Sequence, residues 1–295
     1  MFHHAEFFAL SEPSRIAATF AELRSQRRMA FMPFVTAGDP DVGTTLALIR
    51  ELSGRGVDLI EVGFPYSDPI ADGPVIQASY TRALGHGLRV SDIFTGIASL
   101  TGEDNPSLPN QGDSSVPPLV AMVSYAIVFR TGEETFVQQA RDAGFAGLIV
   151  PDLPGDEAVD FATLVKSHGL DLVPLIAPTT PPERVERILQ VAGGFIYCIS
   201  VAGTTGVRDQ LPDELLQQLK WLKSKTSLPL AVGFGISKPE HVETLRGLAD
   251  GVIVGSAIVR QIETISNGSA TKEDVLAQVG DFAAHMVAAT RLPRK

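Results

Sequence analysis

The run AFMPFVTA (residues 30–37) is the first of eight similar apolar runs that together indicate the fold class. The other seven are VDLIEVGF (57–64), PLVAMVS (118–124), GLIVPD (147–152), DLVPLIAP (171–178), FIYCIS (195–200), LPLAVGFG (228–235) and GVIVGS (251–256). Short runs rich in β-branched residues are typical of strands, and amphipathic segments separate one run from the next. This alternation predicts repeated strand–helix units. Eight such units close a parallel sheet into a barrel.

Most of these runs are apolar at successive positions, as expected for parallel strands covered by helices outside and by packed side chains inside. The predicted fold class is therefore α/β, a (β/α)8 TIM barrel with its core over about residues 30–260. The alternative is an open doubly wound sheet. It is disfavoured because no GxGxxG motif follows the first run and the strand spacing holds to the last one.

Two segments lie outside the regular alternation. Ile16, Phe20 and Leu23 recur at helical spacing, which predicts an extra N-terminal helix over about residues 14–27 that covers the bottom of the barrel. Residues 101–117 are rich in turn formers and predict a surface insertion. We expect residues 1–295 to form a single TIM-barrel domain.

Two helix starts carry the pattern of a capping box, in which a hydroxyl residue precedes a glutamate by three positions. Ser237 with Glu240 predicts a helix directly after the run at 228–235, and Thr180 with Glu183 predicts one after the run at 171–178.

Composition excludes several classes of function. The chain has 24 Lys and Arg against 34 Asp and Glu, a net charge of -10, and no basic run, so a nucleic acid is not an expected partner. Cys198 is the only cysteine and the six histidines are not clustered, so neither an internal disulfide nor a metal site is expected. The N-terminus does not resemble a signal peptide, and no apolar run reaches the roughly 20 residues of a membrane span. We expect a cytoplasmic protein.

Glu61 is the first candidate catalytic residue. It lies inside the run VDLIEVGF between Ile60 and Val62, and a carboxylate in such a strand must be paired, have a raised pKa, or take part in the chemistry. The alternative is a buried salt bridge. Because the eight runs contain no basic residue, its partner would have to come from a loop or helix.

The segment PYSDPIADGP (65–74) directly follows Glu61's strand and contains Asp68 and Asp72. Either aspartate could simply cap a turn, an alternative that weighs more for Asp68 than for Asp72. Active sites of such barrels form at the C-terminal ends of the strands. Glu61 and Asp72 could therefore converge on one substrate from two sides, as acid–base chemistry requires.

The last three strand ends carry glycine-rich turns, VAGTTGV, GFGIS and GSAI. Gly206, Gly235 and Gly255 would let backbone amides approach an anion, and the helix after the last strand would direct its positive end to the same place. These turns predict a phosphate site, although tight strand–helix turns also favour glycine.

Six motifs together resemble the alpha subunit family of tryptophan synthase, from about residue 15 to about residue 265. They are PFVTAGDP (33–40), EVGFPYSDPIADGP (61–74), VPDLP (150–154), SVAGTTG (200–206), GFGIS (233–237) and GSAIV (255–259). The resemblance implies a lyase of tryptophan biosynthesis that cleaves indole-3-glycerol phosphate to indole and glyceraldehyde 3-phosphate by a retro-aldol reaction.

The resemblance also implies roles for individual residues. Glu61 would protonate indole C3 and then accept the hydroxyl proton, and Asp72 would hold the indole N–H. The residues expected around the indole are Phe34, Ile149, Tyr197, Thr205 and Phe234; those expected at the phosphate are Gly206, Gly235, Gly255 and Ser256. For Phe34, Tyr197 and Phe234 the alternative is ordinary barrel core.

By the same resemblance, the chain itself needs no cofactor. It would dock on a beta subunit that contains pyridoxal phosphate, in an alpha2beta2 tetramer, through the loop that holds Pro65 and Asp68. Ser124 and Ala126 depart from a Tyr and an Asn that are frequent in the family, and Val201 from an Arg. The first two departures put partner contacts on this face in question.

Three other functions stay open at this point. A free-standing indole-3-glycerol phosphate lyase would use the same active site. A different phosphate-binding barrel is disfavoured by the motif that holds Glu61 and Asp72. A non-catalytic regulatory subunit would be free to lose both acids, and this chain retains them.

Overall fold

The computed structural model of the protein describes residues 13–69, 72–101, 116–155, 157–199, 211–233 and 235–291. All paired strands are parallel, and the expectation of a parallel β/α barrel is confirmed. The strands are β1 Ala30–Thr36, β2 Ile60–Gly63, β3 Leu119–Met122, β4 Phe145–Ile149, β5 Asp171–Val173, β6 Leu175–Ile176, β7 Ile196–Ile199, β8 Leu230–Gly233 and β9 Gly251–Val254.

In the described residues the eight predicted runs give nine strands, because one run is interrupted. β5 pairs with β4 and β6 pairs with β7, and only Pro174 separates the two strands. Proline has no amide hydrogen to donate to a ladder. Its carbonyl accepts a hydrogen bond from the amide of Tyr197 at 3.0 Å. The run at 171–178 therefore connects both ends of the sheet and closes the barrel.

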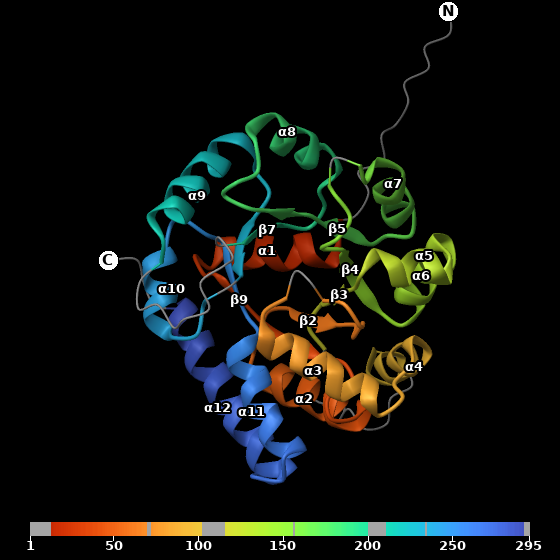
Figure 1. The fold of residues 1–295 in the computed structure, drawn as a ribbon. Coiled ribbons are helices and arrows are strands. Elements are labelled where there is room, and N and C mark those ends of the chain that lie inside the picture. The colour runs from red at the N-terminus through yellow and green to blue at the C-terminus, as the bar shows by residue number, and fades with distance from the viewer. Residues whose placement is uncertain are drawn as a thin grey trace, which may run out of the picture.

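The helices surround the strands as an outer ring, and α1 lies across one end of the barrel (Figure 1). Helix α1 confirms the expected N-terminal helix. The helices are α1 Arg15–Ser25, α2 Val42–Gly54, α3 Pro74–Gly85, α4 Val90–Thr101, α5 Tyr125–Thr131, α6 Glu133–Asp142, α7 Val159–Ser167, α8 Pro182–Val191, α9 Asp213–Lys225, α10 Pro239–Leu245, α11 Ser256–Ser266 and α12 Lys272–Arg291.

The hydrophobic core consists of two clusters, and successive residues of a strand belong alternately to one cluster and to the other. On β1, Met32 and Phe34 belong to the cluster inside the barrel, whereas Phe31 and Val35 belong to the cluster between strands and helices. Side chains of successive strand residues point to opposite faces, so a strand buried on both faces is apolar throughout. The inner cluster is closed at the bottom by α1, whose Phe20 ring lies 5.7 Å from that of Phe195 in the same cluster.

The two predicted capping boxes are wrong. Helix α8 begins at Pro182 after Pro181, and α10 begins at Pro239 after Lys238, each without a side-chain cap. Thr180 Oγ1 instead accepts a hydrogen bond from the amide of Ala177 at 3.1 Å. Proline suits the first helical position because it has the right φ and no amide to satisfy, so these helices begin without a hydroxyl cap.

The predicted insertion at 101–117 lies largely outside the described residues, since only residues 101, 116 and 117 are described. No helix in the described part of the chain is long and apolar enough to cross a membrane.

Candidate active site

Glu61 is the buried acid of the barrel interior. Its position on β2 has the same parity as Leu59 of the inner cluster, while Ile60 and Val62 belong to the outer cluster. The residue is 3% exposed, and neither Oε1 nor Oε2 has a hydrogen-bond partner among the described residues. Burial raises the pKa of Glu61 to about 8, with a further contribution from the charge of Asp72. In the described residues no salt bridge compensates this carboxyl group.

Asp72 lies in the loop between β2 and α3, and two sets of contacts hold it. Its amide donates to the carbonyl of Pro69 at 3.2 Å, and the Gln77 side chain donates to the carbonyls of both Asp72, at 2.8 Å, and Pro69, at 3.1 Å. Burial raises the pKa of Asp72 to about 6, and a hydrogen bond from the Tyr66 hydroxyl opposes this rise. The loop before α3 is therefore tied to the first turn of that helix.

The two carboxyl groups differ in charge near neutral pH. With a pKa of about 8 Glu61 is mostly protonated, whereas Asp72 with a pKa of about 6 is mostly ionised. Two acids whose environments separate their pKa values form an acid–base pair, in which one can donate a proton while the other stays an anion.

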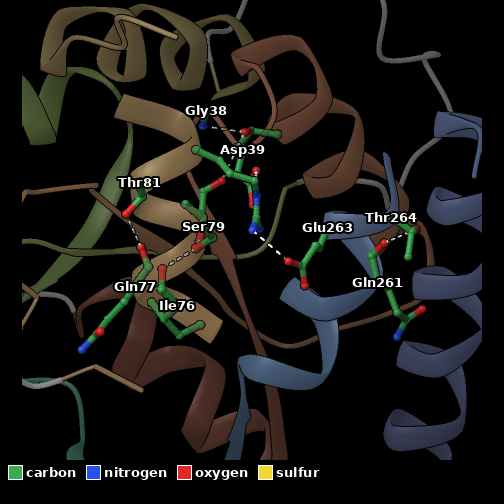
Figure 2. Close-up of polar contacts among 12 residues, drawn as sticks. Gly38, Asp39, Ile76, Gln77, Ser79, Thr81, Gln261, Glu263 and Thr264 are labelled. Atoms are coloured by element: carbon green, nitrogen blue, oxygen red, sulfur yellow. Dashed lines mark hydrogen bonds and ion pairs between the residues drawn. The ribbon is translucent and has the colours of Figure 1, made fainter. Parts of the chain in front are cut away.

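Helix α3, which follows Asp72, is fixed to the end of β1 and to α11 (Figure 2). Arg82 makes a bidentate contact with the buried carboxylate of Asp39, at 3.0 Å from Nε to Oδ1 and 2.7 Å from Nη2 to Oδ2. Nη1 of the same arginine reaches Glu263 Oε1 of α11 at 3.4 Å. The hydroxyls of Thr36 on β1 and Ser79 on α3 lie 2.7 Å apart. These contacts set where the Asp72 loop meets the barrel.

Phe34, Ile149 and Tyr197 all belong to the inner cluster and are buried. For Phe34 and Tyr197 this burial agrees equally with the alternative role as ordinary barrel core. The two aromatic rings pack on glycines of neighbouring strands. A Cβ atom at Gly63 would lie 2.4 Å from Phe34 Cζ, and one at Gly233 would lie 2.2 Å from the Tyr197 hydroxyl oxygen. Both strand positions must therefore remain glycine for the rings to occupy this end of the interior.

The described part of the predicted phosphate site lies at the ends of β8 and β9. Gly235 has φ 81°, a left-handed conformation that favours glycine. Gly255 is the N-cap of α11, and its carbonyl accepts hydrogen bonds from the amides of Ile258 at 2.9 Å and Val259 at 3.1 Å. The amides of Ser256 and Ala257 have no acceptor within the helix, and such groups attract anions. Thr205, Gly206 and Phe234 lie outside the described residues.

Pro65 and Asp68 line a surface groove with a volume of about 1140 Å³. The loop after β2, the α3–α4 connection and α5 form its walls. The other lining residues are Tyr66, Ser67, Leu84, Leu88, Arg89, Val90, Ile93, Ser124, Ala126, Ile127, Arg130, Thr131 and Asp152. On α5 the side chain of Phe129 is 71% exposed, which is unusual for a large apolar residue.

The two departures at Ser124 and Ala126 are both on this groove. Ser124 is buried, caps α5, and donates to Asp152 Oδ2 at 2.7 Å, while the amide of Tyr125 donates to Asp152 Oδ1 at 2.7 Å. The serine therefore fixes the start of α5 to the end of the neighbouring strand–loop unit.

Several contributors to the site were missed from sequence. The sequence did contain a signal for Tyr66, because this residue lies in PYSDPIADGP with the two aspartates. Tyr80 is buried with its ring 5.6 Å from that of Tyr66, and Gln77 and Arg82 lie on the same helix. These three have no local sequence signal, because their partners lie in other elements. Cys198 is buried and free, and burial raises the pKa of its thiol.

Comparison with known proteins gives consistent matches. The family model described as tryptophan synthase alpha chain matches residues 20–290. The tryptophan synthase alpha chain of Rhodopirellula baltica is 44% identical over 272 residues, which cover 90% of this chain and 95% of that one. That of Gloeobacter violaceus is 42% identical over 289 residues, covering 97% and 99%.

Solved structures agree with these matches. The tryptophan synthase alpha chain of Legionella pneumophila superposes with a TM-score of 0.81 at 33% identity, covering 94% of this chain and 97% of that one. A ligand-free tryptophan synthase structure from M. tuberculosis superposes with a TM-score of 0.80 at 29% identity, covering 95% and 100%.

Proposed function

The chain belongs to the tryptophan synthase alpha chain family, and on that premise we propose that Glu61 and Asp72 carry out its reaction. It is a carbon–carbon lyase of tryptophan biosynthesis, which cleaves indole-3-glycerol phosphate to indole and glyceraldehyde 3-phosphate. The reaction uses no cofactor in this chain, and pyridoxal phosphate belongs to the beta subunit. The observation that carries the proposal is the carboxyl group of Glu61, buried in the barrel without a hydrogen-bond partner among the described residues.

Glu61 acts twice in the proposed mechanism. Its protonated form, favoured by the raised pKa, delivers a proton to indole C3, and the ring becomes positively charged. The resulting carboxylate then removes the proton of the neighbouring glycerol hydroxyl. As the aldehyde carbonyl forms, the C3–glycerol bond breaks and its electron pair returns to the ring, which leaves neutral indole. A positioned proton donor or acceptor of this kind typically contributes a rate factor of about 100 to 10,000.

Asp72 holds the indole N–H in the proposed mechanism. Its carboxylate accepts a hydrogen bond from this group and stabilises the positive charge that develops on the ring. A pKa of about 6 leaves the group ionised at neutral pH, and the Tyr66 hydroxyl supports the charged form. The ties from Gln77 to the loop backbone would keep the carboxylate in place as the charge appears.

The remaining site residues are assigned to the two ends of the substrate. Phe34, Ile149, Tyr197, Thr205 and Phe234 would surround the indole, and the buried inner-cluster positions of the first three support this for them. Gly206, Gly235, Gly255 and Ser256 would bind the phosphate, supported by the left-handed Gly235 and the N-terminus of α11. We assign residues 1–295 to one domain.

We further propose that a beta subunit docks on the groove lined by Pro65 and Asp68, in an alpha2beta2 tetramer. Phe129, exposed on the same helix as the lining residues Ala126 and Ile127, supports an interaction surface on this side, since exposed large apolar side chains are typical of interfaces. The loop that holds Asp72 starts at this groove, so docking would act directly on the active-site loop.

The test is indole release from indole-3-glycerol phosphate by the purified chain, with and without a beta subunit loaded with pyridoxal phosphate. We expect slow wild-type turnover that rises with the partner, and a loss of about 100-fold to 10,000-fold in Glu61→Gln. Glu186→Gln, which changes a glutamate 61% exposed on α8, is the matched control and should keep full activity.

Retained turnover in Glu61→Gln would contradict the role of this residue. Fast turnover that is indifferent to the partner would instead identify a free-standing lyase. No turnover by the wild type in any condition would contradict the catalytic assignment.

A further inference from the structure

A second pocket, with a volume of about 280 Å³, lies at the opposite end of the barrel from the candidate active site. Its lining includes Met29 and Asp250, which directly precede the first residues of β1 and β9. Gly255 of the phosphate site directly follows the last residue of β9. The whole of β9 therefore separates the two sites, and a molecule in this pocket cannot be the substrate at its reaction site.

The pocket is strongly basic in a chain that is acidic as a whole. Four arginines line it, Arg24, Arg27, Arg28 and Arg246, against one acid, Asp250, while the chain carries a net charge of -10. Asp250 is itself engaged, because it accepts from the amide of Leu230 at 3.0 Å and lies 3.7 Å from Lys223 Nζ. Among the described lining residues, arginines therefore outnumber carboxylates, although Arg246 also donates to the carbonyl of Ala289.

Arg28 has a donor that the described residues leave unused. Its Nη2 pairs with Asp58 Oδ1 at 3.1 Å, and its Nη1 donates to Gln26 at 2.9 Å. Its Nε is buried, with no hydrogen-bond partner in the described part of the chain. Arg24 reaches the carbonyl of Ser227 only at 3.4 Å, which is long for a hydrogen bond. A buried donor without an acceptor is unfavourable, and an anion in the pocket would supply one.

Arg27 has the backbone conformation that a glycine would normally supply. It is the one non-glycine residue with positive φ in the described ranges, at 55°. The amide of Arg28 bonds to the carbonyl of Leu23 and that of Arg27 to Arg24, which is the pattern that ends a helix with a left-handed residue. Glycine is preferred there. A strained residue that carries a charged side chain on a pocket wall indicates a functional constraint.

We propose that this pocket binds a small polyvalent organic anion, a metabolite that bears phosphate groups or several carboxylates. The guanidinium group is planar and forms paired hydrogen bonds with phosphate and carboxylate oxygens, so clustered arginines suit both chemistries. The volume is at the lower limit of small-molecule pockets, which begin at about 300 Å³. The ligand is therefore small, with its anionic groups close together.

The experiment follows backbone amide resonances of the full chain during titration with pyrophosphate and, separately, with citrate. Gly247 and Ala249 report on the basic pocket, and Gly235 and Ser256 on the substrate phosphate site. We expect saturable shifts of Gly247 and Ala249 with at least one of the two anions. Pyrophosphate alone would identify a phosphate-bearing ligand, and citrate alone a polycarboxylate.

The variant Arg27→Gly distinguishes an effect on anion binding from an effect on the stability of the fold. Glycine removes the backbone strain, so the variant should unfold at the same or higher denaturant concentration than the wild type. Its dissociation constant for the anion should nevertheless rise by about 10-fold or more, as expected for the loss of a charged hydrogen-bond donor. Arg24→Ala should act in the same direction. Arg141→Ala, an exposed arginine on α6, is the control and should bind as the wild type does.

Two outcomes would overturn the proposal. In one, only Gly235 and Ser256 shift, or the shifts of Gly247 and Ala249 grow linearly without saturation. In the other, Arg27→Gly and Arg24→Ala bind the anion with wild-type affinity. Neither outcome depends on indole production, so this proposal can fail while the proposed function stands.

Discussion

The burial of the Glu61 carboxyl group makes the stability of the protein depend on pH. The folded-state pKa of Glu61 is about 8, against an ordinary value of 4.5, so the folded protein holds this proton more tightly than the unfolded one. The contribution of Glu61 is fully present below pH 4.5 and is lost as pH rises to about 8. We expect the free energy of unfolding to fall across this window and to level off above it.

Glu61→Gln should remove this part of the slope, because glutamine does not titrate. The measurement is urea denaturation of both proteins at a series of pH values. Groups that do not interact with Glu61 contribute equally to the two curves, so their difference reports the titration of Glu61 together with its interaction with Asp72. Parallel curves for the wild type and the variant would contradict the raised pKa.

Tyr66 offers a second test, through the pH dependence of catalysis. The proposed mechanism needs an ionised Asp72 and a protonated Glu61, so kcat/KM should have an acid limb near 6 and an alkaline limb near 8. These values belong to the interacting pair. Tyr66→Phe removes the hydrogen bond that favours the charged form of Asp72, so we expect the acid limb to move to higher pH while the alkaline limb stays in place.

The control for Tyr66→Phe is Tyr125→Phe. The Tyr125 hydroxyl bonds to Glu133 at 2.6 Å instead of to an active-site acid, so this variant should keep both limbs. If the acid limb of Tyr66→Phe also stayed unchanged, the Tyr66 hydroxyl would not be tuning Asp72.

Among the elements, α3 has one buried ion pair, between Arg82 and Asp39, beside the hydrogen bond of Ser79 to Thr36 of β1. The Asp39 side chain is fully buried, and that of Arg82 is 20% exposed. Removing one partner of a buried pair leaves an uncompensated charge, which typically costs about 3 to 5 kcal/mol. We therefore expect Arg82→Ala to lower the free energy of unfolding by about 3 kcal/mol, at the low end because the arginine is partly exposed.

Glu263→Gln is the matched comparison, because Glu263 contacts the same arginine from a side chain 48% exposed. Exposed pairs contribute about 0 to 1 kcal/mol, so this variant should be nearly neutral. Both are measured by urea denaturation. Equal losses in the two variants would mean that burial of Asp39 does not determine the strength of its pair.

The elements also show what sequence patterns can and cannot predict. The eight apolar runs predicted the barrel correctly, because burial on both faces leaves a direct mark on every strand. The capping boxes failed because Pro182 and Pro239 preset the first helical turn without a hydroxyl. Glu61 stood out because a carboxylate is rare in such a run. Its location in the interior is confirmed by burial, whereas its role stays a prediction.

The attachment of α3 could not have been predicted in the same way. Asp39 and Arg82 are 43 residues apart, and neither departs from its local pattern. Their pairing is visible only once β1 and α3 have been brought together in three dimensions. Gln77 and Tyr80 were missed for the same reason, since a helix surface has no local signal for the loop or the ring it will meet.

In the molecule as a whole, the inner hydrophobic cluster connects the two ends of the barrel. Phe20 and Leu23 line the basic pocket and also belong to the inner cluster, which contains Phe34 and Tyr197 at the other end. Close-packed interiors have few voids, so a change at one end must be accommodated by neighbouring side chains. The barrel thus gives the basic pocket physical contact with the core beneath the substrate site, without shared residues between the two sites.

The groove on the side of the barrel, lined by Pro65 and Asp68, gives a prediction about affinity for the beta subunit. If the beta subunit docks on the groove beside α5, Phe129 is suited to be an anchor, because 71% of it is exposed and interfaces concentrate their binding energy in buried aromatic side chains. A strong contact of this kind contributes about 2 kcal/mol or more, so Phe129→Ala should weaken affinity for the beta subunit by about 30-fold. Isothermal titration calorimetry would measure it. Val159→Ala on α7 removes another exposed apolar side chain, 57% exposed, and should bind normally; equal affinities for both variants would place the docking surface elsewhere.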